Sequence, residues 1–137
     1  MVETRAPADA GLVWLAIVTS TLDATTGLRP LRLLFVCSQN RLRSPTAEQV
    51  FADRPGLEAA SAGTNRGADN PLSAELVDWA DIIFVMEKQH QRKLSDNFRP
   101  QLRGKRVVCL GIPDDYEFMQ SELVELLQAK VAKVLRG

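Results

Sequence analysis

The sequence predicts an α/β fold: a three-layer domain with a four-stranded parallel sheet, helices on both faces and a functional loop after the first strand. Two observations carry this prediction. Short apolar runs of strand length alternate along the chain with segments of helical length and periodicity. Such alternation is typical of parallel strands joined by right-handed helical crossovers. The chain has 137 residues, enough for one domain with a hydrophobic core.

The first half of this domain reads as strand, helix and strand. Residues 32–36 form an apolar run that predicts a buried parallel strand. Residues 45–52 predict a helix, which the Pro-Gly pair at 55–56 ends. Residues 57–62 predict a weaker strand, and the glycine-flanked stretch 63–67 predicts a loop.

The second half repeats the alternation. We expect helices over 71–79 and 88–97, the second of them polar, and strands over 82–86 and 106–110. Residues 121–135 predict an amphipathic helix, because apolar side chains recur at helical spacing. Its expected inward-facing residues are Leu123, Leu126, Leu127, Val131, Val134 and Leu135.

Composition excludes several function classes. Lys plus Arg equals Asp plus Glu at 17 each, so no overall field favours nucleic acid or an anionic membrane surface. Two cysteines cannot form a disulfide framework, and we expect Cys109 to be a core residue. Unpaired thiols favour a reducing compartment, so we expect a cytoplasmic protein. The oligomeric state stays open.

Residues 1–30 differ from the rest and read as an N-terminal extension before a domain at 31–137. The apolar run 12–18 is too short to span a bilayer. Glu3 and Asp9 dilute the positive start that a signal peptide needs, which disfavours secretion.

The most informative motif follows the first predicted strand. Cys37 and Arg43 bracket five residues, and Ser44-Pro45 follows at once. This Cys-x5-Arg-Ser spacing is typical of cysteine-dependent phosphatases. A cysteine attacks as its thiolate, which loop N–H groups, a helix N-terminus and a guanidinium all favour. The same groups bind a phosphate dianion, so one loop would serve both nucleophile and substrate.

Individual loop residues suit distinct tasks. Arg43 has a planar fork that takes two phosphate oxygens, which Lys cannot copy. Ser44 is expected to N-cap the helix with Pro45 at its first position, and its hydroxyl is within reach of the sulfur. Asn40 is expected in a left-handed conformation, which Asn tolerates.

The chain resembles the low-molecular-weight protein tyrosine phosphatases from about residue 31 to the end, and most closely a short, mainly bacterial branch of them. The family loop Cys-Leu-Gly-Asn-Ile-Cys-Arg-Ser-Pro matches residues 37–45 at Cys37, Asn40, Arg43, Ser44 and Pro45. The stretches 61–64, 80–87 and 112–116 resemble the family's Ser-Ala-Gly-Thr, Ala-Asp-Leu-Ile-Leu-Val-Met-Asp and Asp-Pro-Tyr segments.

The resemblance implies a phosphatase that hydrolyses phosphotyrosine in proteins, or small aryl phosphates, through a phosphocysteine, with no metal or cofactor. Cys37 would be the nucleophile, Arg43 the phosphate clamp and Asp114 the general acid, with Asp115 as the alternative acid. Phosphate and substrate would contact Ser38, Gln39, Asn40, Arg41, Leu42, Arg43, Ser44 and Tyr116. Tyr116 would flank an aromatic substrate with help from Phe118, or else both rings would only pack locally.

Departures from the family pattern affect the pocket. Gln39 replaces a loop glycine, and Leu42 replaces a second cysteine that can protect the nucleophile. Residues 64–70 form a shorter stretch than in the family, without its wall aromatic, so we expect a shallower pocket. Asp115 replaces the proline after the acid.

Three other functions compete with hydrolysis. The chain could be a phosphate-binding pseudoenzyme, because the pocket wall is short. A thioredoxin-coupled arsenate reductase needs two further cysteines, and only Cys109 remains. A sugar-transport phosphocarrier would not need Arg43. Arg41 is expected to face outward, and His90, the only histidine, is expected on the surface of a polar helix.

Overall fold

A computed structural model of the chain describes residues 30–136. In this part of the chain four strands form one parallel sheet in the order β2-β1-β3-β4. Their bounds are Leu31–Cys37 for β1, Leu57–Gly63 for β2, Ile82–Val85 for β3 and Arg106–Cys109 for β4. The predicted parallel α/β sheet is confirmed, and each predicted strand is within one residue of its observed bounds.

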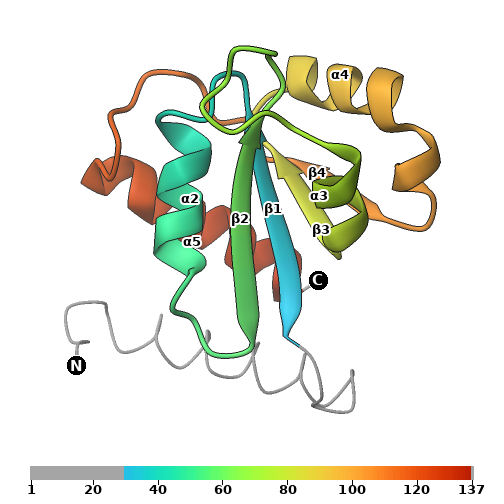
Figure 1. Cartoon of the computed structure of the whole chain (residues 1–137). Helices are drawn as coiled ribbons and strands as arrows, with labels where there is room; N and C mark the ends of the chain where they lie inside the picture. The colour runs from blue at the N-terminus through green and yellow to red at the C-terminus, as the bar shows by residue number, and fades with distance from the viewer. Residues whose placement is uncertain (1–29, 137) are drawn as a thin grey trace.

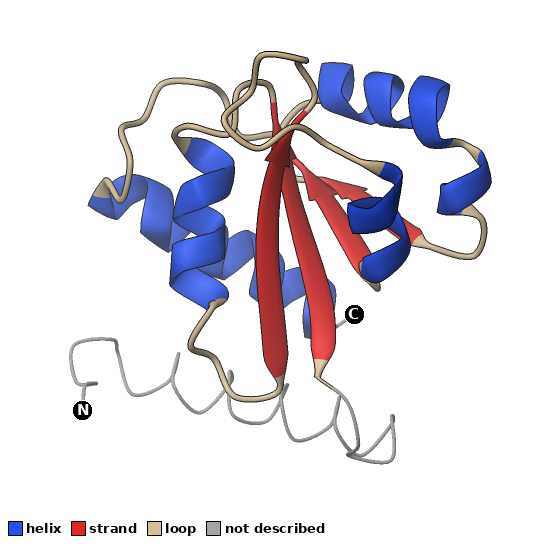
Figure 2. Ribbon diagram, viewed as in Figure 1, coloured by secondary structure: helices blue, strands red, loops and turns tan. Residues whose placement is uncertain are grey.

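Helices cover both faces of the sheet, as Figures 1 and 2 show. Helices α2 (Arg43–Phe51) and α5 (Ser121–Arg136) pack on one face, and α3 (Ala74–Trp79) and α4 (Lys88–Phe98) lie on the other. A short 3₁₀ turn, η1 (Pro100–Leu102), follows α4. The predicted three-layer arrangement is therefore confirmed.

The core consists of two layers because successive strand residues point to opposite faces. Leu33, Phe35 and Cys37 of β1 face α2 and α5, and Leu34 and Val36 face α3 and α4. The Phe35 ring stacks between two other aromatic rings, with centroids 5.6 Å from Phe51 and 5.3 Å from Phe84. The predicted inward-facing residues of α5 lie in this core: Leu123, Leu127 and Val131 are fully buried, and Leu126, Val134 and Leu135 are partly buried.

The sheet places two loops at one edge. Cys37 pairs with Gly63 at the end of β1, and Val85 pairs with Cys109 at the ends of β3 and β4. The loop that follows Cys37 and the loop that follows β4 therefore leave the carboxyl edge together, where parallel sheets bind ligands.

The N-terminal extension predicted at residues 1–30 lies outside the described residues, apart from Pro30. Within residues 30–136 no helix has the length and apolar character that crossing a membrane requires.

Candidate active site

The loop between β1 and α2 is held by the loop after β2. Three backbone N–H groups donate to its carbonyls: Thr64 to Cys37 at 2.8 Å, Asn65 to Ser38 at 3.0 Å and Asp69 to Gln39 at 3.0 Å. A Cβ atom on the Gly63 backbone would lie 2.5 Å from the Ser38 carbonyl oxygen. Only glycine permits this close approach, so the shape of the loop depends on Gly63.

The sulfur of Cys37 is buried among hydrogen-bonding groups. The Asn40 N–H donates to Sγ at 3.3 Å, and the Ser44 hydroxyl oxygen lies 2.8 Å from Sγ. Asn40 has a φ of 58°, the left-handed conformation predicted for it, which turns its N–H toward the sulfur. The Ser44 hydroxyl is also 2.9 Å from Asn40 Oδ1. It carries one proton, so it donates either to Asn40 or to a thiolate.

The predicted start of α2 is wrong. The helix begins at Arg43, and its N-cap position is Leu42, which makes no side-chain cap. Ser44 is therefore a helical residue rather than the N-cap, and Pro45 is the third helical residue rather than the first. The Ser44 hydroxyl lies beside the sulfur of Cys37 and does not cap the helix, which explains the difference. The predicted closeness of this hydroxyl to the sulfur is confirmed.

Arg43 is almost completely buried, with 4% of its side chain exposed. Its Nη1 donates to the Ile112 carbonyl at 2.8 Å and lies 3.1 Å from Glu87 Oε1. Its Nε lies 3.7 Å from Asp114 Oδ1. The anchoring contacts thus use Nη1, and the Nε–Nη2 edge is the one suited to a two-point contact with phosphate.

The candidate catalytic cavity, called the catalytic cavity below, has a volume of about 110 Å³. It brings together residues from the loop, the start of α2 and the loop after β4: Cys37, Ser38, Gln39, Arg41, Leu42, Arg43 and Asp114. Asp114 and Asp115 are both exposed, but only Asp114 lines this cavity. The position of Asp114 therefore fits the role of a general acid better than that of Asp115 does.

The other predicted contacts differ in position. Asn40 and Ser44 are buried beside the sulfur, whereas Arg41 is exposed at the rim and Tyr116 lies outside the lining. The Arg41 side chain is 61% exposed, and its Nε lies 3.4 Å from Asp69 Oδ1, in agreement with its expected outward direction. Tyr116 is half-buried and packs against the core cluster of α2 and α5, outside the lining of the cavity. Phe118 is half exposed. Of the two roles predicted for Tyr116, the structure therefore shows local packing against the core.

The expectation that His90 is a surface residue is wrong. Its side chain is completely buried beneath the loop. Its Nδ1 accepts from the Glu87 N–H at 3.0 Å, so Nε2 carries the proton in the neutral ring and donates to Ser38 Oγ at 2.9 Å. The residues next to His90 in the sequence are polar, which is typical of an exposed helix face. The signal that could have found it is the Glu-x-x-His spacing that begins α4 and forms its capping box.

Electrostatics keep His90 neutral. Burial, followed by the positive charge of Arg43, lowers the pKa of His90 to about 4. The hydrogen bond from Gln89 lowers the pKa of Glu87, and the contact with Arg43 adds to this effect. At neutral pH the ring of His90 therefore supplies a hydrogen bond without a charge, while the ionised Glu87 holds Arg43.

The two cysteines are free and lie on opposite sides of the sheet. Cys37 belongs to the cluster of α2 and α5, whereas Cys109 is half-buried and packs against the cluster of α3 and α4. Among residues 30–136, no group of three or more His, Cys, Asp or Glu side chains is arranged to hold a metal ion.

Solved structures share this fold. A YwlE mutant from Bacillus subtilis superposes with a TM-score of 0.60 at 25% identity, covering 78% of this chain and 99% of that one. Wzb from Vibrio vulnificus in complex with benzylphosphonate gives a TM-score of 0.56 at 26% identity, covering 77% of this chain and 94% of that one.

Relatives with named activities also match. No protein-family model matches the chain. The low molecular weight protein-tyrosine-phosphatase Wzb of Salmonella typhimurium is 34% identical over 116 residues, which covers 62% of this chain and 76% of Wzb. The protein-arginine-phosphatase of Bacillus subtilis is 28% identical over 145 residues, covering 76% of this chain and 96% of the relative. These matches agree with the geometry around Cys37, and the chain belongs to the low-molecular-weight protein-tyrosine-phosphatase family.

Proposed function

We propose that this protein hydrolyses aryl phosphate monoesters, with phosphotyrosine in proteins as the substrate class, through a phosphocysteine intermediate. The observation that carries the proposal is the meeting of three groups at one cavity of about 110 Å³: the Cys37 sulfur, the Arg43 guanidinium and the Asp114 carboxyl. A nucleophile, an oxyanion clamp and a proton donor are the groups that phosphoryl transfer to cysteine requires.

In the first step the Cys37 thiolate attacks phosphorus. A sulfur–phosphorus bond forms while the bond from phosphorus to the phenolic oxygen breaks. Asp114 gives its proton to that oxygen, and the product leaves as a neutral phenol. The Nε–Nη2 edge of Arg43 and the loop N–H groups stabilise the charge on the equatorial oxygens.

In the second step water attacks the phosphocysteine. Asp114, now a carboxylate, takes a proton from that water, and the sulfur leaves as a thiolate. The Ser44 hydroxyl, 2.8 Å from Sγ, donates to the departing sulfur. Inorganic phosphate is released, and the chain returns to its starting state.

Substrate preference is a finer question, because relatives include tyrosine and arginine phosphatases. We favour an aryl phosphate because the cationic Arg41 lines the catalytic cavity. Phosphoarginine carries its own guanidinium beside the phosphate, so its net negative charge is smaller and Arg41 would attract it less. The charge of a phosphotyrosine is confined to the phosphate and is attracted by Arg41.

Hydrolysis of para-nitrophenyl phosphate by the wild type and by Cys37→Ser tests the activity. We expect turnover by the wild type and none by the variant, which keeps the loop N–H groups and Arg43. A wild type that binds phosphate without turnover would make the chain a phosphate-binding pseudoenzyme.

The substrate is tested by comparing a phosphotyrosine peptide with a phosphoarginine peptide of the same sequence. We expect a higher kcat/KM for phosphotyrosine, and Arg41→Gln to reduce the preference about two- to fivefold, the size of an exposed charge effect. A higher kcat/KM for phosphoarginine would show an arginine phosphatase.

We also propose that the protein is located in the cytoplasm, because its two free thiols favour a reducing compartment.

A further inference from the structure

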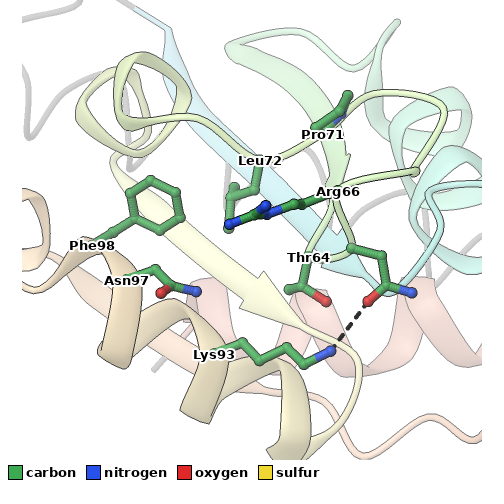
Figure 3. Close-up of a pocket in the computed structure, with 8 residues that line it drawn as sticks. Thr64, Arg66, Pro71, Leu72, Lys93, Asn97 and Phe98 are labelled. Carbon is green, nitrogen blue, oxygen red and sulfur yellow. Dashed lines mark hydrogen bonds between the residues drawn. The ribbon is translucent and has the colours of Figure 1, made fainter.

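A second cavity, of about 270 Å³, lies beside α4 and shares no lining residue with the catalytic cavity. Its walls come from two segments, the loop after β2 and one face of α4. Figure 3 shows Arg66 extending across it, with Lys93, Asn97 and Phe98 of α4 on the opposite wall. Cavities of about 300 Å³ and more hold drug-sized ligands, so this one suits a smaller molecule.

The charged side chains that line this cavity are all positive. Arg66 and Lys93 both line it, and no Asp or Glu does. Within the part of the chain that the structure describes, neither cation forms an ion pair, and Lys93 Nζ donates only to the Asn65 side-chain oxygen at 3.1 Å. Positive and negative residues balance over the whole sequence, so two unpaired cations in one cavity are a local feature.

The rest of the cavity lining contains both polar and apolar side chains. Thr64 has a buried hydroxyl without a hydrogen-bond partner in residues 30–136, and Asn97 adds an amide. A buried polar group without a partner is uncommon in folded proteins and calls for an explanation. Leu72 and the Phe98 ring form an apolar wall, as Figure 3 shows.

We propose that this second cavity binds a small organic phosphate with an aromatic body. The phosphate would lie between Arg66 and Lys93, which donate charge-assisted hydrogen bonds. The aromatic body would lie against Phe98 and Leu72. This site is distinct from the catalytic cavity and is independent of whether Cys37 turns over a substrate.

The site is connected to the catalytic loop through its own wall. Thr64 and Asn65 line the second cavity, and their N–H groups donate to the carbonyls of Cys37 and Ser38. An occupant that contacts Thr64, or that draws Lys93 away from Asn65, therefore acts on the segment that supports the nucleophile.

The test is a nuclear magnetic resonance titration of full-length Cys37→Ser with phenylphosphonate, whose phosphorus–carbon bond this chemistry does not cleave. We expect two groups of backbone amides to shift with separate saturation: residues 38–44, and a second group at Arg66, Lys93, Asn97 and Phe98. The Arg66→Gln/Lys93→Gln double substitution should weaken the second affinity by about tenfold or more, because two charged hydrogen bonds are lost.

The matched control removes two other cations of α4, Lys88 and Arg92, which lie outside this cavity. Lys88→Gln/Arg92→Gln should leave both affinities within about twofold, as expected for exposed charges outside the site. Shifts confined to residues 38–44, or equal weakening of the second affinity by both double substitutions, would overturn the proposal.

A second comparison tests the aromatic part of the ligand. Phenylphosphonate should bind the second site several-fold more tightly than methylphosphonate, and Phe98→Leu should reduce this difference to about twofold or less, because the contact between two aromatic rings is lost. Equal affinities of the two phosphonates for the wild-type cavity would show that the cavity does not recognise an aromatic body.

Discussion

The Ser44 hydroxyl oxygen lies 2.8 Å from the Cys37 sulfur, although the two residues belong to different elements, the first turn of α2 and the end of β1. Asn40 Oδ1 is the competing acceptor for the same hydroxyl proton. A hydrogen bond to a charged group contributes about 1.5–3 kcal/mol. In the proposed mechanism we therefore expect the hydroxyl to favour the thiolate most strongly in the step in which sulfur is the leaving group.

Ser44→Ala should slow hydrolysis of the phosphocysteine roughly 10- to 100-fold, which corresponds to the loss of that hydrogen bond. The first step should slow less, so phosphoenzyme accumulates and rapid-mixing experiments show a burst of phenol. Ser73→Ala is the control, because Ser73 caps α3 away from the loop. A steady-state loss without a burst would place the role of Ser44 in the first step instead.

His90 should make folding stability depend on pH. Its pKa is about 4 in the folded chain and 6.5 as its ordinary value, so the unfolded chain takes up this proton first as the pH falls. The stabilising contribution is complete above pH 6.5 and is lost as the pH falls toward 4. One pKa unit is worth about 1.4 kcal/mol, so the full loss is on the order of 3 kcal/mol.

Urea denaturation of the wild type and His90→Gln at several pH values between 4 and 7 measures this effect. His90 is the only histidine, so the difference in pH dependence between the two chains isolates it from the carboxylates. The charged groups that act on the pKa of the ring, namely Arg43, Glu87, Lys93 and Asp114, are present in both chains. Parallel curves for the two chains would show that His90 is not the titrating group.

Asp114, rather than Asp115, should be the general acid, because only Asp114 lines the catalytic cavity and lies near Arg43. Asp114→Asn should slow the hydrolysis of aryl phosphates with poor leaving groups by about 10²–10⁴-fold, the usual contribution of a positioned general acid. Activated esters need little protonation and should be affected far less. Asp115→Asn is the matched control and should keep most activity. A leaving-group dependence in Asp115→Asn alone would reverse the two roles.

Oxidation of Cys37 should proceed to irreversible forms. Leu42 occupies the position of the family's second loop cysteine, and Cys109 packs on the opposite face of the sheet. Without a neighbouring thiol, a sulfenic acid is open to further oxidation to sulfinic and sulfonic acids. Activity lost to excess peroxide should not return with dithiothreitol. Full recovery, or a disulfide between Cys37 and Cys109 in mass spectra, would contradict this.

The sequence predicted the sheet and its layers because apolar runs and helical periodicity report burial directly. It predicted the loop because the Cys37-to-Arg43 spacing is short-range and specific. Apolar runs and periodicity did not predict the burial of His90, because this polar residue is buried with a hydrogen bond to Ser38, 52 residues away in the sequence. The start of α2 was misplaced for a similar reason, because a contact with sulfur outweighs the capping preference of Ser44.

The most direct test of the account is to detect the phosphoryl group on the enzyme. Asp114→Asn, which should slow hydrolysis of the intermediate, is mixed with para-nitrophenyl phosphate, quenched in acid and digested for mass spectrometry. We predict one added phosphoryl group on the peptide that contains Cys37, located on its sulfur, and none in Cys37→Ser/Asp114→Asn. Product formation without any phosphorylated Cys37, or with the phosphoryl group on another residue, would contradict the cysteine mechanism.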